Sequence, residues 1–234
     1  MQLFNGDCFE VIKSIPDKSV DLCVSDCPYR LGSKGGGIIK KRDYLDYLEE
    51  LDCCNFEPLQ FLEAIKPKMK KFYLYAFCNK TLIYDYIKFA NDNKYSFDVL
   101  CMAKTNPIPA YHNHHLSDLE YIILIKEKGT WFSNHKKMDD YRKFFITQCK
   151  RGFHPAEKPV ELLERFVRVS CPENGVILDP FMGSGSTGVA AVKNHRDFIG
   201  IELDTKYFEI AKERINEAAM LNSIAYKSTV GRSD

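Results

Sequence analysis

Short apolar runs alternate along the chain with segments whose apolar residues recur every three or four positions. A short apolar segment opens the chain at residues 2–4, and runs of strand length follow at residues 20–25, 71–78, 95–103, 119–126, 176–179 and 198–201. Helical periodicity predicts helices at residues 9–15, 44–66, 81–91, 160–167, 187–193 and 207–221. Such alternation is typical of an α/β domain with a parallel sheet.

Carboxylates follow several of the predicted strands. Asp7 and Asp26 do so within the first 30 residues, and Asp179 and Glu202 do so near the end of the chain. Open parallel sheets bind ligands outside the carboxyl ends of their strands. We therefore expect one edge of the sheet to be the active one.

Residues 176–188 (VILDPFMGSGSTG) are an apolar run that stops at Asp179 and enters a glycine loop before a helix. Glycine permits a tight turn and a close approach of the backbone to a ligand. Glu202 follows the glycine loop at about the sequence spacing of a ribose-binding acid in dinucleotide sites. Asp179 argues against a dinucleotide, because a carboxylate repels a pyrophosphate and attracts an ammonium. S-adenosylmethionine, with an amino-acid tail, a ribose and a cationic centre, fits better. The alternative is a plain strand-turn-helix.

Composition indicates an ordinary globular protein. The 234 residues suffice for one domain with a small insertion, and 33 basic against 32 acidic residues leave a net charge of +1. Any nucleic-acid surface must therefore be local, at the basic segments 34–42, 66–71 or 136–151. Nine cysteines without a C-x-x-C pair, no recognisable signal peptide and no apolar run of membrane-spanning length predict a cytoplasmic protein. We expect no metal site, because the histidines at 112, 114 and 115 lack ligand partners at a recognised spacing.

The tetrapeptide Asp26-Cys27-Pro28-Tyr29 fits methylation of an exocyclic amine. The Asp26 carboxylate and the Cys27 carbonyl can accept the two hydrogens of the amine, and Pro28 restricts Cys27 to extended geometry. Tyr29 offers a face on which a flipped base can stack. By itself the tetrapeptide could equally be a strand-to-loop turn, with Tyr29 as a core aromatic.

Four segments in the same order resemble the motifs of the permuted β-type amino-methylating DNA methyltransferases. Residues 26–29 resemble Asp-Pro-Pro-Tyr, residues 104–109 Lys-x-Asn-x-x-Pro, residues 154–159 His-Pro-x-Gln-Lys-Pro, and residues 179–187 Asp-Pro-Phe-x-Gly-Ser-Gly-Thr. Cys27 stands where the family has proline, and Glu157 where glutamine is usual. The resemblance implies methyl transfer from S-adenosylmethionine to N6 of adenine in DNA, with Asp26 rather than serine favouring adenine over cytosine N4. We expect a bacterial or phage-encoded protein of a restriction-modification kind.

The resemblance also implies a doubly wound, Rossmann-like, circularly permuted sheet. The catalytic half would span residues 1–107, a short irregular target-recognition insertion 108–153, the cofactor half 154–221, and a disordered tail 222–234. The strand missing after Glu202 would be the N-terminal one, which would bring the chain ends together and place Asp7 and Cys8 beside the cofactor's adenine. Besides these two residues and Asp26, the expected cofactor-binding residues are Lys158, Asp179, Phe181, Gly183, Ser184, Gly185, Ser186, Thr187 and Glu202.

The expected partner is DNA with a flipped adenine, held by the local basic loops, and a homodimer is conceivable by family resemblance. Two other functions stay open: methylation of cytosine N4 or another amine or amide, and a non-catalytic DNA-binding relative, which the Cys27 departure suggests.

Overall fold

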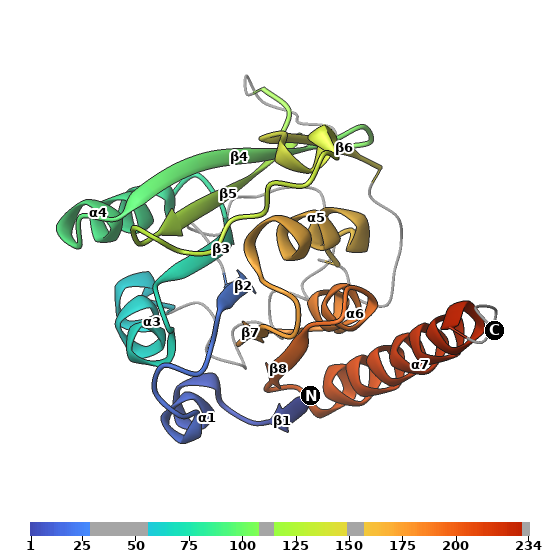
Figure 1. Cartoon of the computed structure of the whole chain (residues 1–234). Helices are drawn as coiled ribbons and strands as arrows, with labels where there is room; N and C mark the ends of the chain where they lie inside the picture. The colour runs from blue at the N-terminus through green and yellow to red at the C-terminus, as the bar shows by residue number, and fades with distance from the viewer. Residues whose placement is uncertain (29–55, 108–114, 149–156, 231–234) are drawn as a thin grey trace.

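The computed structural model describes residues 1–28, 56–107, 115–148 and 157–230, with side chains up to residue 224 (Figure 1). Tyr29, the basic segment 34–42 and the histidine of the 154–159 motif lie outside these residues. The described strands are β1 (Gln2–Asn5), β2 (Leu22–Asp26), β3 (Tyr73–Cys78), β4 (Ser96–Lys104), β5 (Leu119–Lys126), β6 (Phe144–Thr147), β7 (Val176–Asp179) and β8 (Asp197–Glu202). The described helices are α1 (Cys8–Ser14), α3 (Pro58–Ile65), α4 (Ile83–Asp92), α5 (Val160–Ser170), α6 (Ser186–Lys193) and α7 (Thr205–Val230), with 3₁₀ turns η2 (Lys66–Lys68) and η3 (Met138–Tyr141).

All eight described strands form one sheet in the order β1-β8-β7-β2-β3-β5-β4-β6. The five strands from β1 to β3 are parallel, so their carboxyl ends share one edge of the sheet. β1 pairs with β8 along its whole length, with Asn5 opposite Glu202. This pairing confirms the prediction that the N-terminal strand completes the cofactor half of a permuted, Rossmann-like sheet.

Helices cover both faces of the sheet, with α1, α3 and α4 on one side and α5, α6 and α7 on the other (Figure 1). β3 is buried along its whole length between these layers, as expected of a strand read from a continuous apolar run. Its Tyr73 and Tyr75 hydroxyls each lie 2.8 Å from the Ser170 hydroxyl of α5. Tyr75 also stacks on Phe166, with 4.1 Å between ring centroids. These contacts fix α5 against the sheet. The N-terminus of α5 faces the edge formed by the carboxyl ends of the parallel strands, which we call the active edge.

The structure differs from the sequence expectations in three places. β5 runs antiparallel between β3 and β4, and β6, inside the segment expected to be irregular, pairs parallel with β4. β6 is only four residues long and lies in a segment of mixed basic and aromatic residues without a clear period. Helix α7 continues to Val230 instead of ending near residue 221, and it leads the C-terminal part of the chain away from β1 (Figure 1). The last described residue, Val230, therefore lies far from β1, contrary to the expectation that the chain ends come together, although β1 does lie beside β8.

None of the described helices is both long enough and apolar enough to cross a membrane.

Candidate active site

Carboxylates from three parallel strands gather at the active edge. Asp26 ends β2, Asp179 ends β7 and Glu202 ends β8. In the sheet β7 lies between β8 and β2, so Asp179 ends the strand between those of the other two acids. Burial is the main cause of the raised pKa of Asp179, and the charges of Asp26 and Glu202 add to it. The structure thus brings together, at one edge, acids that are up to 176 positions apart in sequence.

Asp26 forms an ion pair with Lys158, and the Lys158 Nζ lies 2.5 Å from Asp26 Oδ2. The Lys158 side chain is 7% exposed and sits just before the start of α5, with its ammonium 5.2 Å from the centre of the Phe77 ring. Asp26 is 24% exposed, so this carboxylate can still be reached from solvent. The ammonium that we expected near the cofactor therefore contacts the expected catalytic carboxylate.

Lys158 is also paired with Glu120 of β5, whose Oε2 lies 3.5 Å from Lys158 Nζ. The other oxygen of Glu120 pairs with Lys104 at the end of β4. Burial opposes the charge of Lys158, but Asp26 and Glu120 outweigh burial and raise the pKa of this ammonium. Burial would likewise raise the pKa of Glu120, yet Lys158 and Lys104 lower it below its usual range. The four side chains thus form one row in which acidic and basic groups alternate.

Cys27 directs its thiol into the core rather than toward the edge. The side chain is buried, the Ser25 hydroxyl lies 3.4 Å from its sulfur, and burial raises the pKa of the thiol to about 12. A protonated, buried thiol is a packing group and not a nucleophile. The replacement of proline by Cys27 is therefore compatible with a backbone role for this position, and Pro28 follows it in the chain.

The glycine loop connects β7 to α6. Gly183 (φ +52°) and Gly185 (φ +84°) both have left-handed backbones, and Gly185 caps the N-terminus of α6. Asp179 at its start is buried, and burial raises the pKa of its carboxyl to about 7. The Phe181 amide donates to Asp179 Oδ1 at 3.1 Å, and Thr187 also donates to this carboxyl. Ser184, Ser186 and Thr187 are buried in the same loop.

Glu202 holds two backbone segments with one carboxylate. Its oxygens accept hydrogen bonds from the amides of Gly183 and Asp204, each at 2.8 Å, while burial raises the pKa of the carboxyl. The Glu202 carbonyl accepts a bond of 3.0 Å from the Gly6 amide, which places the start of α1 beside it. There Asp7 caps α1 and Cys8 is buried. Their expected place beside the adenine of the cofactor stays a prediction.

Arg214 of α7 supports the glycine loop from behind. Its Nη1 donates to the Ser184 carbonyl at 2.6 Å and to the Ser184 hydroxyl at 2.9 Å. Its Nη2 lies 2.7 Å from Oε1 of Glu157, and the Ser186 hydroxyl also contacts that oxygen at 3.4 Å. Glu157 therefore has a guanidinium partner that balances its charge where the family usually has glutamine.

Phe181 contributes to an aromatic cluster beside the loop. Its ring centre lies 5.6 Å from that of Phe56 and 5.5 Å from that of Phe61 in α3. Phe181 is only partly buried by these contacts. The cluster provides an apolar wall next to Asp179.

The donors and space at this edge fit S-adenosylmethionine. A side chain at Gly183 would meet no atom within 4 Å among the residues that the structure describes, so the loop borders open space there. A buried carboxyl with a pKa near 7 is stabilised in its charged form by an ammonium group. The neighbouring acids and the partly exposed aromatic wall suit a ligand with a cationic sulfur centre.

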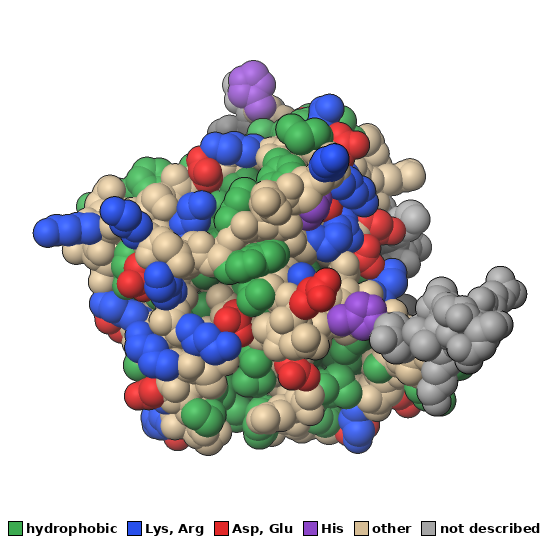
Figure 2. All heavy atoms as spheres, in the orientation of Figure 1, with side chains coloured by type: hydrophobic (Ala, Val, Ile, Leu, Met, Phe, Trp, Pro, Cys, Tyr) green, Lys and Arg blue, Asp and Glu red, His purple; other side chains and the backbone are tan. Residues whose placement is uncertain are grey.

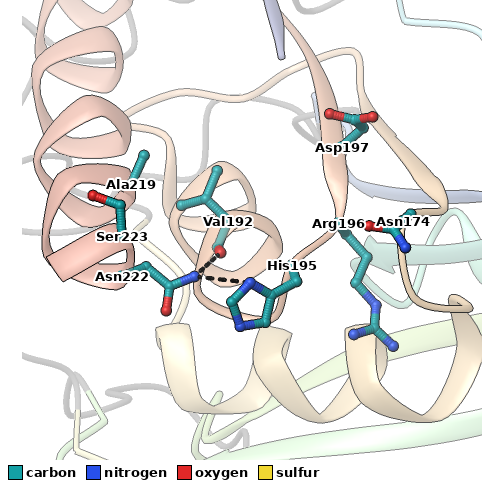
Figure 3. A pocket seen from close by; sticks show the side chains of 8 residues that line it. All are labelled: Asn174, Val192, His195, Arg196, Asp197, Ala219, Asn222 and Ser223. Atoms are coloured by element: carbon teal, nitrogen blue, oxygen red, sulfur yellow. Dashed lines mark hydrogen bonds between the residues drawn. The ribbon is translucent and has the colours of Figure 1, made fainter. Parts of the chain in front are cut away.

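A hollow of about 410 Å³, shown in Figure 3, lies near the amino ends of β7 and β8. It is lined by Asn174, Val192, His195, Arg196, Asp197, Ala219, Asn222 and Ser223. Asp197 begins β8 and Glu202 ends it, so the strand length of roughly 17 Å separates this hollow from the active edge. Arg196 there donates to the Cys171 carbonyl, which fixes its guanidinium in the turn before β8.

Basic and acidic side chains are interspersed over the face shown in Figure 2. This distribution agrees with the net charge of +1. Among the residues that the structure describes, no group of three or more metal-ligating side chains is placed to hold a metal ion.

Sequence reasoning missed three charged residues of the site: Lys104 as an ion-pair partner, Glu120 and Arg214. A single acid inside the apolar run 119–126 was the available signal for Glu120, because an isolated charge in a buried strand needs a partner. Arg214 lies in an ordinary amphipathic helix, and nothing local marks it.

Comparison with known proteins identifies the family of the chain. Residues 20–213 match the family model of the N6/N4 DNA methylases. The chain is 30% identical to the Type II methyltransferase M2.LlaDCHI of Lactococcus lactis subsp. cremoris, over 93% of this chain and 90% of that protein. It is 28% identical to M.HinfI of Haemophilus influenzae, over 92% of this chain and 68% of that protein.

Solved structures of DNA methyltransferases also align with the chain. A complex of M1.HpyAVI with S-adenosylmethionine aligns with a TM-score of 0.69 and 27% identity, over 91% of this chain and 98% of that one. The cytosine-N4-specific PvuII DNA methyltransferase aligns with a TM-score of 0.67 at 16% identity, over 94% of this chain and 91% of that one, which shows a shared fold. The chain belongs to the N6/N4 DNA methylase family and is an S-adenosylmethionine-dependent DNA methyltransferase.

Proposed function

We propose that the protein transfers the methyl group of S-adenosylmethionine to the exocyclic N6 of adenine in DNA. The observation that carries this proposal is the position of Asp26. A partly exposed carboxylate ends β2, two strands from Glu202 and next to Asp179, where a flipped base would meet the cofactor space. Aspartate rather than serine at this position favours adenine by family resemblance.

In this proposal Asp26 and the Cys27 carbonyl accept hydrogen bonds from the amine and hold it toward the methyl donor. Positioning supplies most of the rate enhancement, because bringing the two reactants into line removes the entropy cost of their encounter. Tyr29, outside the described residues, stacks on the base. When bound, S-adenosylmethionine supplies a methyl group on a sulfonium.

We assign the other residues of the edge to the cofactor. Asp179 binds the ammonium of the methionine end, the loop of Gly183, Ser184, Gly185, Ser186 and Thr187 surrounds that end, and Phe181 lies against the cofactor. Glu202 binds the ribose hydroxyls, and Asp7 with Cys8 borders the adenine. Support comes from the buried charge of Asp179 and from the Gly6 bond that places α1 beside Glu202.

The test is methyl transfer from tritiated S-adenosylmethionine to unmethylated genomic DNA by the wild type and by Asp26→Ala. We expect Asp26→Ala to lose transfer by about a thousandfold while binding the cofactor normally. Asp17→Ala, an exposed acid of the same half of the chain, is the control and should keep full activity. Full transfer by Asp26→Ala would disprove the role of Asp26.

Digestion of the product to nucleosides, followed by mass spectrometry, identifies the acceptor base. N6-methyladenine supports the proposal, and N4-methylcytosine would replace it with the other activity of the family. No methylated base at all would indicate a DNA-binding relative without turnover.

A further inference from the structure

Four charged side chains form a row that ends at Asp26: Lys104, Glu120, Lys158 and Asp26. They come from β4, β5, the segment before α5, and β2. β5 is the strand that runs antiparallel between β3 and β4, and its second residue is Glu120. The row therefore connects the catalytic carboxylate to the antiparallel half of the sheet.

The row is electrically neutral, with two cations and two carboxylates in alternation. Lys158 is buried and lies just before the N-terminus of α5, where the helix dipole adds positive potential. A buried ammonium in such a place requires negative partners. Glu120, at 19% exposure, supplies one and Asp26 the other, at 3.5 Å and 2.5 Å from Lys158 Nζ.

Resting on the proposed function, we propose that Glu120 is a positioning residue for methyl transfer. It shares the Lys158 ammonium with Asp26, which leaves the Asp26 carboxylate oriented and able to accept a hydrogen bond from the target amine. Without the charge of Glu120, Lys104 and Lys158 would leave an excess positive charge beside Asp26. The Lys158 ammonium would then bind Asp26 more strongly and compete with the amine.

The test compares single-turnover methyl transfer by the wild type, Glu120→Gln and Glu120→Asp, with saturating cofactor and unmethylated genomic DNA. We expect Glu120→Gln to be slower by about tenfold, because a small misplacement of a reacting group is costly. Cofactor affinity, measured by calorimetry, should stay within about twofold, since Glu120 acts on the amine side of the site. Glu120→Asp keeps the charge and should recover most of the rate.

Glu161→Gln is the matched control. Glu161 is an exposed acid in the first turn of α5, so its removal changes the net charge by the same amount near the same helix end. It should transfer methyl groups at the wild-type rate. The proposal is overturned if Glu120→Gln matches the wild type. It is also overturned if the loss is accompanied by an equal loss of cofactor affinity or a large drop in melting temperature, which a purely structural role predicts.

A double variant tests whether the effect passes through Lys158. If it does, adding Glu120→Gln to Lys158→Met slows transfer no further, because the ammonium that Glu120 positions is already gone. A further tenfold loss in the double variant would contradict the route through Lys158. Total methyl transfer is measured without regard to the base, so a cytosine product would revise the proposed acceptor and leave the test of Glu120 intact.

Discussion

At the scale of single residues, the acids of the active edge differ in what stabilises their charge. Asp26 and Glu120 face ammonium groups, and Glu202 accepts from two backbone amides. Asp179 is buried, its neighbours Asp26 and Glu202 are also acidic, and its pKa is raised to about 7. The environment of each carboxylate therefore decides its role. In our proposal Asp26 orients the amine, Glu202 holds the loop and Asp179 binds the ammonium of the cofactor.

The first prediction concerns the pH dependence of cofactor binding. An ammonium binds the ionised form of Asp179, so affinity for S-adenosylmethionine should fall as the pH is lowered from about 8 to about 6, with the change centred near the pKa of about 7. Calorimetry at both pH values checks this. In Asp179→Asn we expect weaker binding and little remaining pH dependence, and an unchanged dependence would show that another group is responsible.

The pH dependence of the stability of the cofactor-free protein has the opposite sign to that of cofactor binding. The folded-state pKa of Asp179 lies above the unfolded value of about 3.9, so its protonated form favours folding. This contribution is fully present below about pH 4 and is lost as the pH rises through about 7. At about pH 8, Asp179→Asn should therefore raise the melting temperature of the cofactor-free protein by a few degrees. A lower melting temperature for this variant, measured by calorimetry, would contradict the prediction.

At the scale of the elements, two glycines of one loop serve different purposes. A Cβ at Gly185 would lie 2.9 Å from Cβ and 3.0 Å from Cα of Ala211 in α7, so this glycine allows helix and loop to touch. Gly183, with nothing within 4 Å of such a Cβ among the described residues, faces the open space of the edge instead. Gly185 is thus a packing glycine, whereas Gly183 borders open space.

This difference predicts opposite outcomes for two alanine substitutions. Gly185→Ala should destabilise the protein by roughly 2–4 kcal/mol, because the left-handed backbone and the contact with α7 both oppose a side chain. Gly183→Ala should destabilise the protein by only about 1 kcal/mol, because only its left-handed backbone opposes a side chain. It should, however, weaken cofactor binding severalfold. Chemical unfolding and calorimetry separate the two effects. Equal losses of stability in both variants would refute the distinction.

At the scale of the whole molecule, the first strand of the chain, β1, forms the edge of the sheet next to β8 and β7, which come last in the chain. Asn5 fixes this strand, because its side-chain amide donates to the carbonyls of Glu202 and Leu203 at 2.9 Å and 3.1 Å. The Thr205 hydroxyl donates to the Asn5 side-chain oxygen at 2.9 Å. One side chain thus joins β1, the end of β8 and the start of α7.

We expect Asn5→Ala to lower stability by about 1 kcal/mol, since three exposed hydrogen bonds are lost. It should also weaken cofactor binding, because the turn after Glu202 loosens. Gln2→Ala, at the other end of the same strand and equally exposed, is the control. If Asn5→Ala binds the cofactor as tightly as Gln2→Ala does, the N-terminal strand has no part in the site.

The sequence by itself determined the α/β class, most of the strands and helices, and the acids and glycines of the active edge. These features are local: strand and helix periods, turn glycines and short motifs are written in neighbouring residues. The place of β1 followed only from the resemblance to the permuted methyltransferases, which implies that the N-terminal strand lies beside the strand that ends at Glu202. The four-residue β6, the antiparallel insertion of β5 and the length of α7 carried no comparable local pattern.

The tertiary structure alone decided which charges meet. Lys158 reaches Asp26 across 132 positions, Glu120 joins them from an inserted strand, and Arg214 reaches Ser184 from a helix that follows the loop. No residue type or spacing encodes such partners, because they depend on the order of strands in the sheet and on the side on which each helix packs. A buried charged residue requires a partner of opposite charge. Only the fold determines which side chain can contact that residue directly.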